Sequence, residues 1–190
     1  MLKELVSKNR SFRRFYQDVA IDLDTLRELI DLARLSASAS NMQPLKYILS
    51  CDPQKNALIF QCIAWAGYLN DWPGPTAGER PSAYIVILND NDIKSLLPDF
   101  DCGIGAQSIL LGATEKGFGG CMIYSVQREK LQEALKIPPR YEIRLVLALG
   151  KPKETVKIDP LGPDEDIKYW RDSKAVHHVP KRALDYIIIG

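Results

Sequence analysis

The run Ala83-Tyr84-Ile85-Val86-Ile87-Leu88 constrains the fold most, because it is apolar at every position. A strand that buries one face alternates apolar and polar residues, whereas an uninterrupted apolar strand must be covered on both faces. We therefore predict that this run is a central strand, with other layers packed on each side of its sheet. Further stretches of strand-like composition should join it: Tyr47–Leu49, Cys121–Tyr124 and Ile143–Gly150.

Helical patterns lie between these strands. Apolar residues recur at helical spacing from Leu23 to about Leu35, after a capping Asp22 or Asp24. A long helix is predicted from about Phe100 to Lys116, with Gly117 at its C-terminal cap and with Gly103 and Gly105 expected to allow close helix packing. Shorter helices are predicted over 1–8, 53–63 and 127–135, the last with Ser125 as its cap. This loose alternation favours an α+β sandwich over a regular doubly wound sheet.

Length and charge limit what the chain can do. Its 190 residues are typical of one domain, which we expect to span residues 1–190. The 25 basic residues nearly balance the 24 acidic ones, which argues against broad electrostatic capture of nucleic acid or of an acidic membrane. No apolar run has the length of a membrane span or of a signal peptide, so we expect a cytoplasmic protein. The four separated cysteines are expected to be reduced and mostly buried.

A local anion site is indicated near the N-terminus. Arg10, Arg13 and Arg14 stand beside Ser11 and between aromatic residues. The guanidinium group is a planar fork of donors suited to phosphate or to a delocalised oxyanion. A solvated basic face is the alternative interpretation of this cluster.

Two loops carry further candidate residues. In the loop 36–44, small residues permit close backbone approach to a ligand, and Ser38, Asn41 and Gln43 supply hydrogen-bonding side chains. A plain surface loop would have the same composition. The proline-rich segment 64–81 could be a packed flap or a cover over a flat ligand, with aromatic residues at Trp65, Tyr68 and Trp72.

Four motifs in register resemble the nitroreductase family of flavin enzymes. They are an Arg-Ser-x-Arg-x-Phe-like element, an Ala-Arg to Asn-x-Gln-Pro loop, a Gly-x-Gly-x-Cys element and a basic C-terminal element. In this chain they occupy Arg10–Phe15, Ala33–Pro44, Gly117–Ile123 and Pro180–Asp185. The resemblance spans nearly the whole chain, and it implies a flavin-sandwich fold with a central, mostly antiparallel sheet flanked by helices.

The resemblance also implies FMN as cofactor. Arg10 and Ser11 would contact its phosphate and ribityl chain, and Arg13 would reach the pyrimidine edge of the ring. Lys181 and Arg182 would close on the phosphate from the other end of the chain. Cations suit a dianionic phosphate, and a cation near the ring stabilises the anionic reduced flavin.

The family binds FMN at a homodimer interface, which implies residues from two subunits and an exchanged C-terminal segment. The second subunit would supply Ser38, Ala39, Asn41 and Gln43. Backbone N–H groups of Tyr124 and Ser125 would lie near the reactive N5 of the flavin.

The implied activity passes hydride from NADH or NADPH through FMN to a small flat acceptor, such as a quinone or nitroaromatic. No catalytic side chain is required, because the flavin carries the chemistry. Trp65, Tyr68 and Trp72 would shape the choice of acceptor. A non-catalytic flavin sensor and a phosphate-binding domain without flavin are the alternatives.

The chain departs from the family pattern at Asn9, Ala37 and Met122, where relatives carry a basic residue, proline and tryptophan. The family's mid-chain polar contact to the ring is unplaced, with Gln61 and Asn70 as candidates.

Two rival sites involve the adjacent histidines. Cys121 with His177 or His178 could form a nucleophile and base, but the histidines are expected in a polar tail. A surface turn is favoured over a metal site for the histidine pair, and no metal is expected. Arg171 and Asp172 should form a local ion pair or add to the phosphate site.

Overall fold

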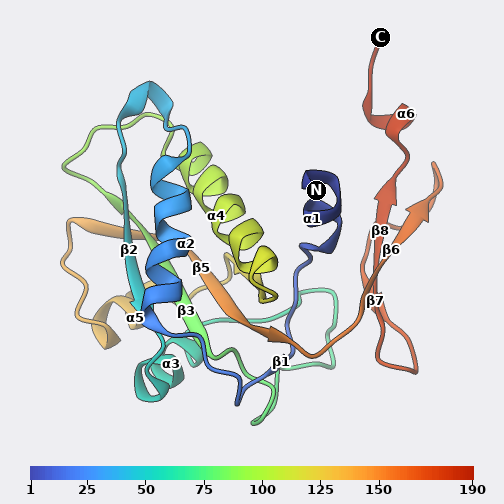
Figure 1. Cartoon of the computed structure of the whole chain (residues 1–190), viewed down its shortest axis with the longest axis horizontal. Coiled ribbons are helices and arrows are strands. Elements are labelled where there is room, and N and C mark those ends of the chain that lie inside the picture. The colour runs from blue at the N-terminus through green and yellow to red at the C-terminus, as the bar shows by residue number, and fades with distance from the viewer.

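The computed structural model describes residues 1–190 and is built on a five-stranded sheet (Figure 1). Four strands lie in the order β1 (Phe15–Tyr16), β5 (Tyr141–Pro152), β3 (Ala83–Asp90) and β2 (Leu45–Ser50). The fifth, β4 (Gly119–Ile123), also pairs with β5, and every pairing in this sheet is antiparallel.

Strand β3 is the centre of the sheet, as the apolar run predicts. All eight of its residues are buried, and it pairs with β2 on one side and β5 on the other. Facing pairs such as Ile85 with Leu147 and Val86 with Ile48 line the two faces of the sheet. Two apolar cores result, one on each face.

The helices α2 (Leu23–Leu35) and α4 (Pro98–Glu115) cover one face, while α3 (Pro53–Phe60) and α5 (Arg128–Ala134) pack on the other (Figure 1). Gly112, rather than the predicted Gly103, permits close packing of α4 on α2, because an added Cβ would stand 2.3 Å from Leu32 Cδ1. Gly103 has nothing within 4 Å, whereas an added Cβ at Gly105 would stand 3.2 Å from the Tyr47 hydroxyl of β2 and 3.6 Å from Ala33 Cβ of α2, so Gly105 also faces a helix as predicted.

Most predicted helix ends are correct, with two exceptions. Asp22 caps α2 by accepting from the Thr25 N–H, and Asp52 caps α3 in the same way. Gly117 adopts the left-handed conformation after α4, at φ 77°. Ser125 does not cap α5, which begins after Gln127, and α3 ends at Phe60 rather than near Ile63.

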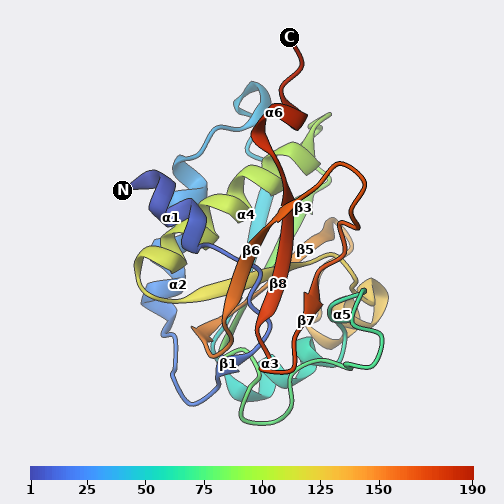
Figure 2. The same ribbon diagram turned by 90° about the vertical axis from the view of Figure 1, so that its right-hand side faces the viewer.

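The C-terminal forty residues form a second sheet that the sequence did not indicate. It has the order β6 (Val156–Leu161), β8 (His177–Arg182), β7 (Trp170–Arg171), with β6 and β8 parallel. Figures 1 and 2 show this sheet standing beside α1 (Leu2–Lys8), with α6 (Leu184–Ile187) projecting beyond it. We call residues 153–182 the C-terminal arm.

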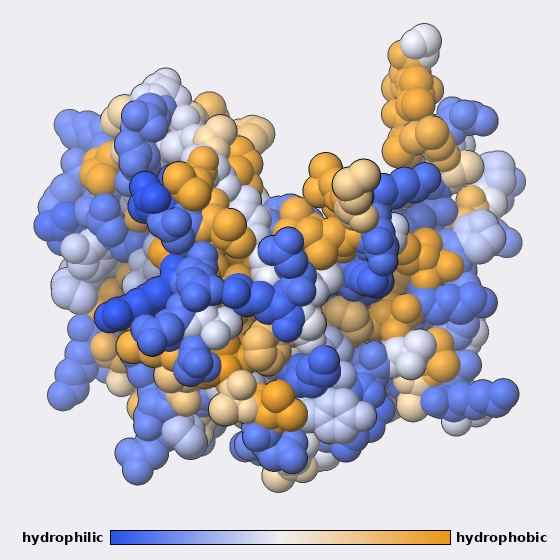
Figure 3. Space-filling model, in the orientation of Figure 1, coloured by the Kyte–Doolittle hydropathy of each residue, from blue (hydrophilic) through white to orange (hydrophobic).

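The apolar end of the chain is uncovered. Ile187, Ile188 and Ile189 are all exposed, the last almost completely. In the space-filling view the end projects as an apolar column (Figure 3).

The short 3-10 turn η1 (Ala39–Asn41) lies in the loop before β2. No helix combines the length and the apolar character needed to cross a membrane.

Candidate functional site

The two ends of the chain meet at a cavity of about 360 Å³. The segment after α1 contributes Arg10, Ser11 and Arg13, and β8 contributes Lys181. The motifs predicted all four of these residues. The rest of the lining comes from α4, β4 and the C-terminal arm, together with Asn9: Asn9, Gln107, Leu110, Met122, Tyr169, His177 and Val179.

The Gly-Gly motif of β4 positions the arginine segment. The Phe12 N–H donates to the Gly120 carbonyl at 3.0 Å, and Ser11 forms a parallel bridge with Gly120. A Cβ at Gly119 would stand 2.6 Å from the Phe12 ring, and one at Gly120 would stand 2.5 Å from the Ala148 carbonyl oxygen. Glycine at 119 therefore lets the arginine segment lie close to the strand, and glycine at 120 lets β4 pair closely with β5.

Arg10 has a charge and an unpartnered donor that suit an anionic ligand. Its Nη2 donates to the Val6 carbonyl at 2.6 Å, while its buried Nε has no partner. Burial lowers the pKa of the Arg10 guanidinium, since its charge is partly removed from water. An anion in this cavity would satisfy the free donor and face the charges of Arg10, Arg13 and Lys181.

Arg13 is buried at 8% exposure and is held by the C-terminal arm. Its backbone N–H donates to the Glu154 carboxylate, its Nη1 lies 3.1 Å from His177 Nε2, and its guanidinium lies 4.7 Å from the centre of the Tyr169 ring. Nη1 also donates to the Ser11 carbonyl at 3.2 Å. The Nε and Nη2 groups make no protein hydrogen bond, so they remain available to a ligand.

A smaller cavity of about 160 Å³ adjoins the first, because Arg13, Met122 and Tyr169 line both. It contains the predicted Tyr124 and Ser125, just beyond the end of β4. The first cavity is the cationic end of the site and the second is its aromatic end, and Arg13 lines both.

The aromatic segment behaves mainly as a packed flap. Of its three predicted residues only Trp65 lines either of the two joined cavities. Tyr68 packs on Tyr169 with ring centres 4.9 Å apart, and Trp72 lies 4.7 Å from the Arg171 guanidinium. The C-terminal arm therefore fastens this segment beside the site.

The loop 36–44 lies apart from the arginine cluster within one chain. Ser38 and Gln43 line a different cavity of about 320 Å³ that also includes Asp101. Ser38 Oγ and the Ala39 N–H donate to the two oxygens of Asp101 at 2.7 and 2.8 Å, and Asn41 is exposed outside that cavity. These four predicted residues thus do not join the site within a single chain.

Other predictions are corrected by the structure. His177 and His178 do not lie in a polar surface turn: they are buried on β8, where His178 stacks on Trp170 and contacts Asp159 at 2.5 Å. Arg171 pairs with Glu154 at 3.1 Å rather than with Asp172. The remaining candidates Arg182, Gln61 and Asn70 line neither of the joined cavities.

Cys121 is not equipped as a nucleophile. Burial raises the pKa of its thiol, which donates weakly to the Met122 carbonyl and makes no hydrogen bond with a histidine. The arm residues Glu154, Tyr169 and His177 are functional candidates that sequence reasoning missed.

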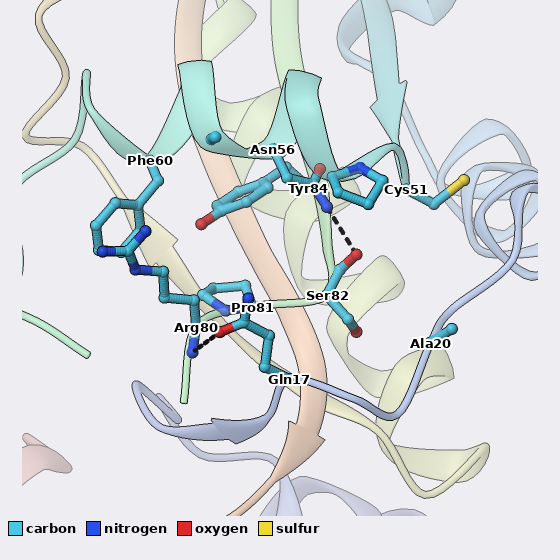
Figure 4. A pocket seen from close by; sticks show the side chains of 11 residues that line it. Gln17, Ala20, Cys51, Asn56, Phe60, Arg80, Pro81, Ser82 and Tyr84 are labelled. Carbon is cyan, nitrogen blue, oxygen red and sulfur yellow. Dashed lines mark hydrogen bonds between the residues drawn. The ribbon is translucent and has the colours of Figure 1, made fainter. Parts of the chain in front are cut away.

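A further cavity of about 170 Å³ lies near the start of β3 (Figure 4). It is lined by Arg80, Tyr84 and Phe60 among others, and no residue of the four motifs contributes to it. The Arg80 guanidinium covers the Phe60 ring at 4.2 Å, and both Arg80 Nε and the Tyr84 hydroxyl are buried without a partner. Because no motif residue lines this cavity, we assign it no role.

Comparison with known proteins agrees with this geometry. Residues 6–151 match the model of the nitroreductase family. An Archaeoglobus fulgidus protein with the provisional name NADH dehydrogenase/NAD(P)H nitroreductase is 28% identical over 158 residues, covering 80% of this chain and 85% of that protein.

Solved structures show the same fold. A nitroreductase family protein from Clostridium novyi NT has a TM-score of 0.68 and 25% identity, with coverage of 100% of this chain and 99% of that one. An FMN-dependent nitroreductase from Clostridium difficile R20291 has a TM-score of 0.67 and 23% identity, with coverage of 98% and 96%. The α+β fold, with its antiparallel sheet between helices, is the nitroreductase fold, and the chain belongs to the nitroreductase family.

Proposed function

We propose that this protein is an FMN-dependent oxidoreductase that passes hydride from NADH or NADPH to a small flat acceptor, such as a quinone or nitroaromatic. The observation that carries the proposal is the meeting of Arg10, Arg13 and Lys181 from both ends of the chain in one cavity. Family membership supports the oxidoreductase class, and the Clostridium difficile relative, which is named as FMN-dependent, supports the cofactor.

The charges that line the cavity suit the phosphate of FMN. Arg10 and Lys181 offer a phosphate the cations it needs, and the unpartnered Nε of Arg10 supplies a free donor. Arg13 would bind the pyrimidine edge of the ring with Nε and Nη2, the donors that make no hydrogen bond within the protein. Tyr124 and Ser125 would flank the ring from the aromatic end of the site.

Bound FMN would supply the two-electron chemistry that side chains lack. The protein's part is then to bind and orient: the cations hold the phosphate, Arg13 places positive charge where negative charge develops on reduction, and the apolar wall of Trp65 and Met122 limits water.

We propose a homodimer with FMN at its interface. Within one chain Ser38, Ala39, Asn41 and Gln43 cannot reach the arginine cavity, so a second subunit would have to supply them. The exposed apolar residues after β8 would exchange onto that partner, since such a surface is costly in water. Arg182, which lies near Tyr186 outside the cavity, would act only in this assembly.

The test is steady-state oxidation of NADH and NADPH by the FMN-loaded protein with menadione as the quinone. The proposal expects menadione-dependent turnover with at least one donor. FMN binding without turnover by either donor would favour a flavin sensor instead.

A further inference from the structure

The C-terminal arm supplies most of the contacts that fix Arg13. Glu154, Tyr169 and His177 all touch it, and all three lie beyond residues 6–151 that match the family model. The arm therefore adds to the site in a way that the family motifs did not show.

His177 makes the contact that matters most for the guanidinium. It is fully buried, and its Nε2 lies 3.1 Å from Arg13 Nη1. Arginine has five N–H donors and no acceptor, so the histidine nitrogen must accept this bond. Nε2 is then unprotonated and the ring proton resides on Nδ1.

That tautomer lowers the stability of the folded protein. Nδ1 is buried and has no partner, and a buried unpaired donor is destabilising. Burial of the ring, together with the cationic neighbours Arg13 and Arg171, lowers the pKa of His177 to about 4. The imidazole is thus neutral at physiological pH, as an acceptor for arginine must be.

The second point of attachment is Glu154. Its side chain is fully buried, accepts from the backbone N–H groups of both Arg13 and Arg14, and is paired with Arg171 at 3.1 Å. Glu154 fixes the backbone of Arg13, whereas His177 and the Ser11 carbonyl fix Nη1. The only guanidinium donors that stay free are Nε and Nη2.

We propose that His177 is a positioning residue: by accepting from Arg13 Nη1, it orients the guanidinium so that Nε and Nη2 face the FMN ring. This inference rests on the proposed function, because the ring is the ligand that Arg13 would meet. His177 also lines the cavity, but its side chain is fully buried, and the role proposed for it acts through Arg13.

The first test is a double-mutant cycle on the FMN dissociation constant, measured by quenching of flavin fluorescence. His177→Leu should weaken FMN binding about tenfold, the loss typical of one hydrogen bond to a charged group. In an Arg13→Ala background the same substitution should change the constant less than about twofold, because its partner is gone. An equal loss in both backgrounds would overturn the proposal.

Conservative and control variants separate positioning from damage. Gln places an amide oxygen near the position of Nε2, so His177→Gln should restore most of the affinity lost in His177→Leu. His178→Gln changes the neighbouring buried residue of the same strand and should leave the constant within about twofold. Failure of His177→Gln to restore binding, with a native circular dichroism spectrum, would contradict the proposal.

A measurement without FMN tests the geometry directly. Nitrogen-15 NMR of the histidine rings should show His177 with an unprotonated Nε2 and a protonated Nδ1 at neutral pH, and the opposite tautomer would refute the proposed acceptor. If the protein binds no FMN at all, both this inference and the proposed function fail. If FMN binds and only the mutant cycle is additive, the inference alone fails.

Discussion

Arg10 and Lys181 reach one cavity from opposite ends of the chain, and we propose the phosphate of FMN as their partner. Replacing either with alanine should therefore weaken binding of FMN about ten- to a hundredfold, the range for charge-assisted hydrogen bonds. Binding of riboflavin, which has no phosphate, should change little. Fluorescence titration with both flavins measures the ratio, with Lys94→Ala as the surface control. Equal losses of affinity for both flavins would show that Arg10 and Lys181 do not bind the phosphate.

His177 should also make stability depend on pH. Its pKa falls from the ordinary 6.5 to about 4 in the folded protein, chiefly through burial. Between these values the unfolded state binds more protons, so the free energy of unfolding should decrease as pH falls through this window. The contribution of one such group is at most about 1.4 kcal/mol per pH unit.

Urea unfolding of wild type and His177→Gln at pH 7 and pH 4.5 checks this assignment. The variant should lose less stability between the two pH values than wild type, because its side chain does not titrate. The same loss in both proteins would show that His177 is not the titrating group.

At the level of the elements, two glycines should respond in opposite directions to alanine. Gly120→Ala would place a Cβ 2.5 Å from the Ala148 carbonyl oxygen across the β4–β5 pairing. Backbone cannot move aside as a side chain can, so we expect destabilisation of about 1–3 kcal/mol. Gly103→Ala lies within α4 with nothing within 4 Å, and should stabilise by about 0.5–1 kcal/mol.

Thermal unfolding of the two variants measures both effects against wild type. A Gly120→Ala protein with unchanged Tm would contradict the close approach of β4 to Ala148 of β5.

The elements that could be predicted from sequence are those with strong periodicity. The apolar run of β3 and the helical spacing of α2 depend on burial against a core, which leaves its pattern in the chain. The second sheet left none: β6 and β8 carry charged and proline residues, and their parallel pairing joins segments about twenty residues apart. His177 was therefore mistaken for part of a polar tail.

The residues of the candidate site divide in the same way, into those that a local sequence pattern indicates and those that it does not. Residues within compact motifs, such as Arg10, Ser11 and Arg13, could be found by their spacing, although their contact with FMN stays a prediction. Glu154, Tyr169 and His177 act through tertiary contacts that no local pattern records. Of the expected cover, Tyr68 and Trp72 pack on the arm and Trp65 lines the smaller cavity, so its role over a flat ligand stays a prediction.

At the scale of the whole molecule, the proposed dimer should depend on the apolar C-terminus. Removing residues 184–190 deletes Leu184, Tyr186 and the exposed isoleucines, and should shift the mass measured by light scattering from dimer to monomer. FMN affinity should fall in parallel, because the site would lose the residues that a partner contributes. Leu58→Asp, an exposed change on α3, is the control and should stay dimeric. A truncated protein that remains dimeric would contradict the exchange.

The central claim is that the cavity at the meeting of the two chain ends holds a redox-active FMN. The most direct measurement is the visible absorption spectrum of the purified, FMN-supplemented protein under anaerobic conditions, before and after NADH and NADPH are added. The account predicts a bound oxidised-flavin spectrum that bleaches with at least one donor. A protein that retains no flavin, or whose bound flavin neither donor reduces, would contradict it.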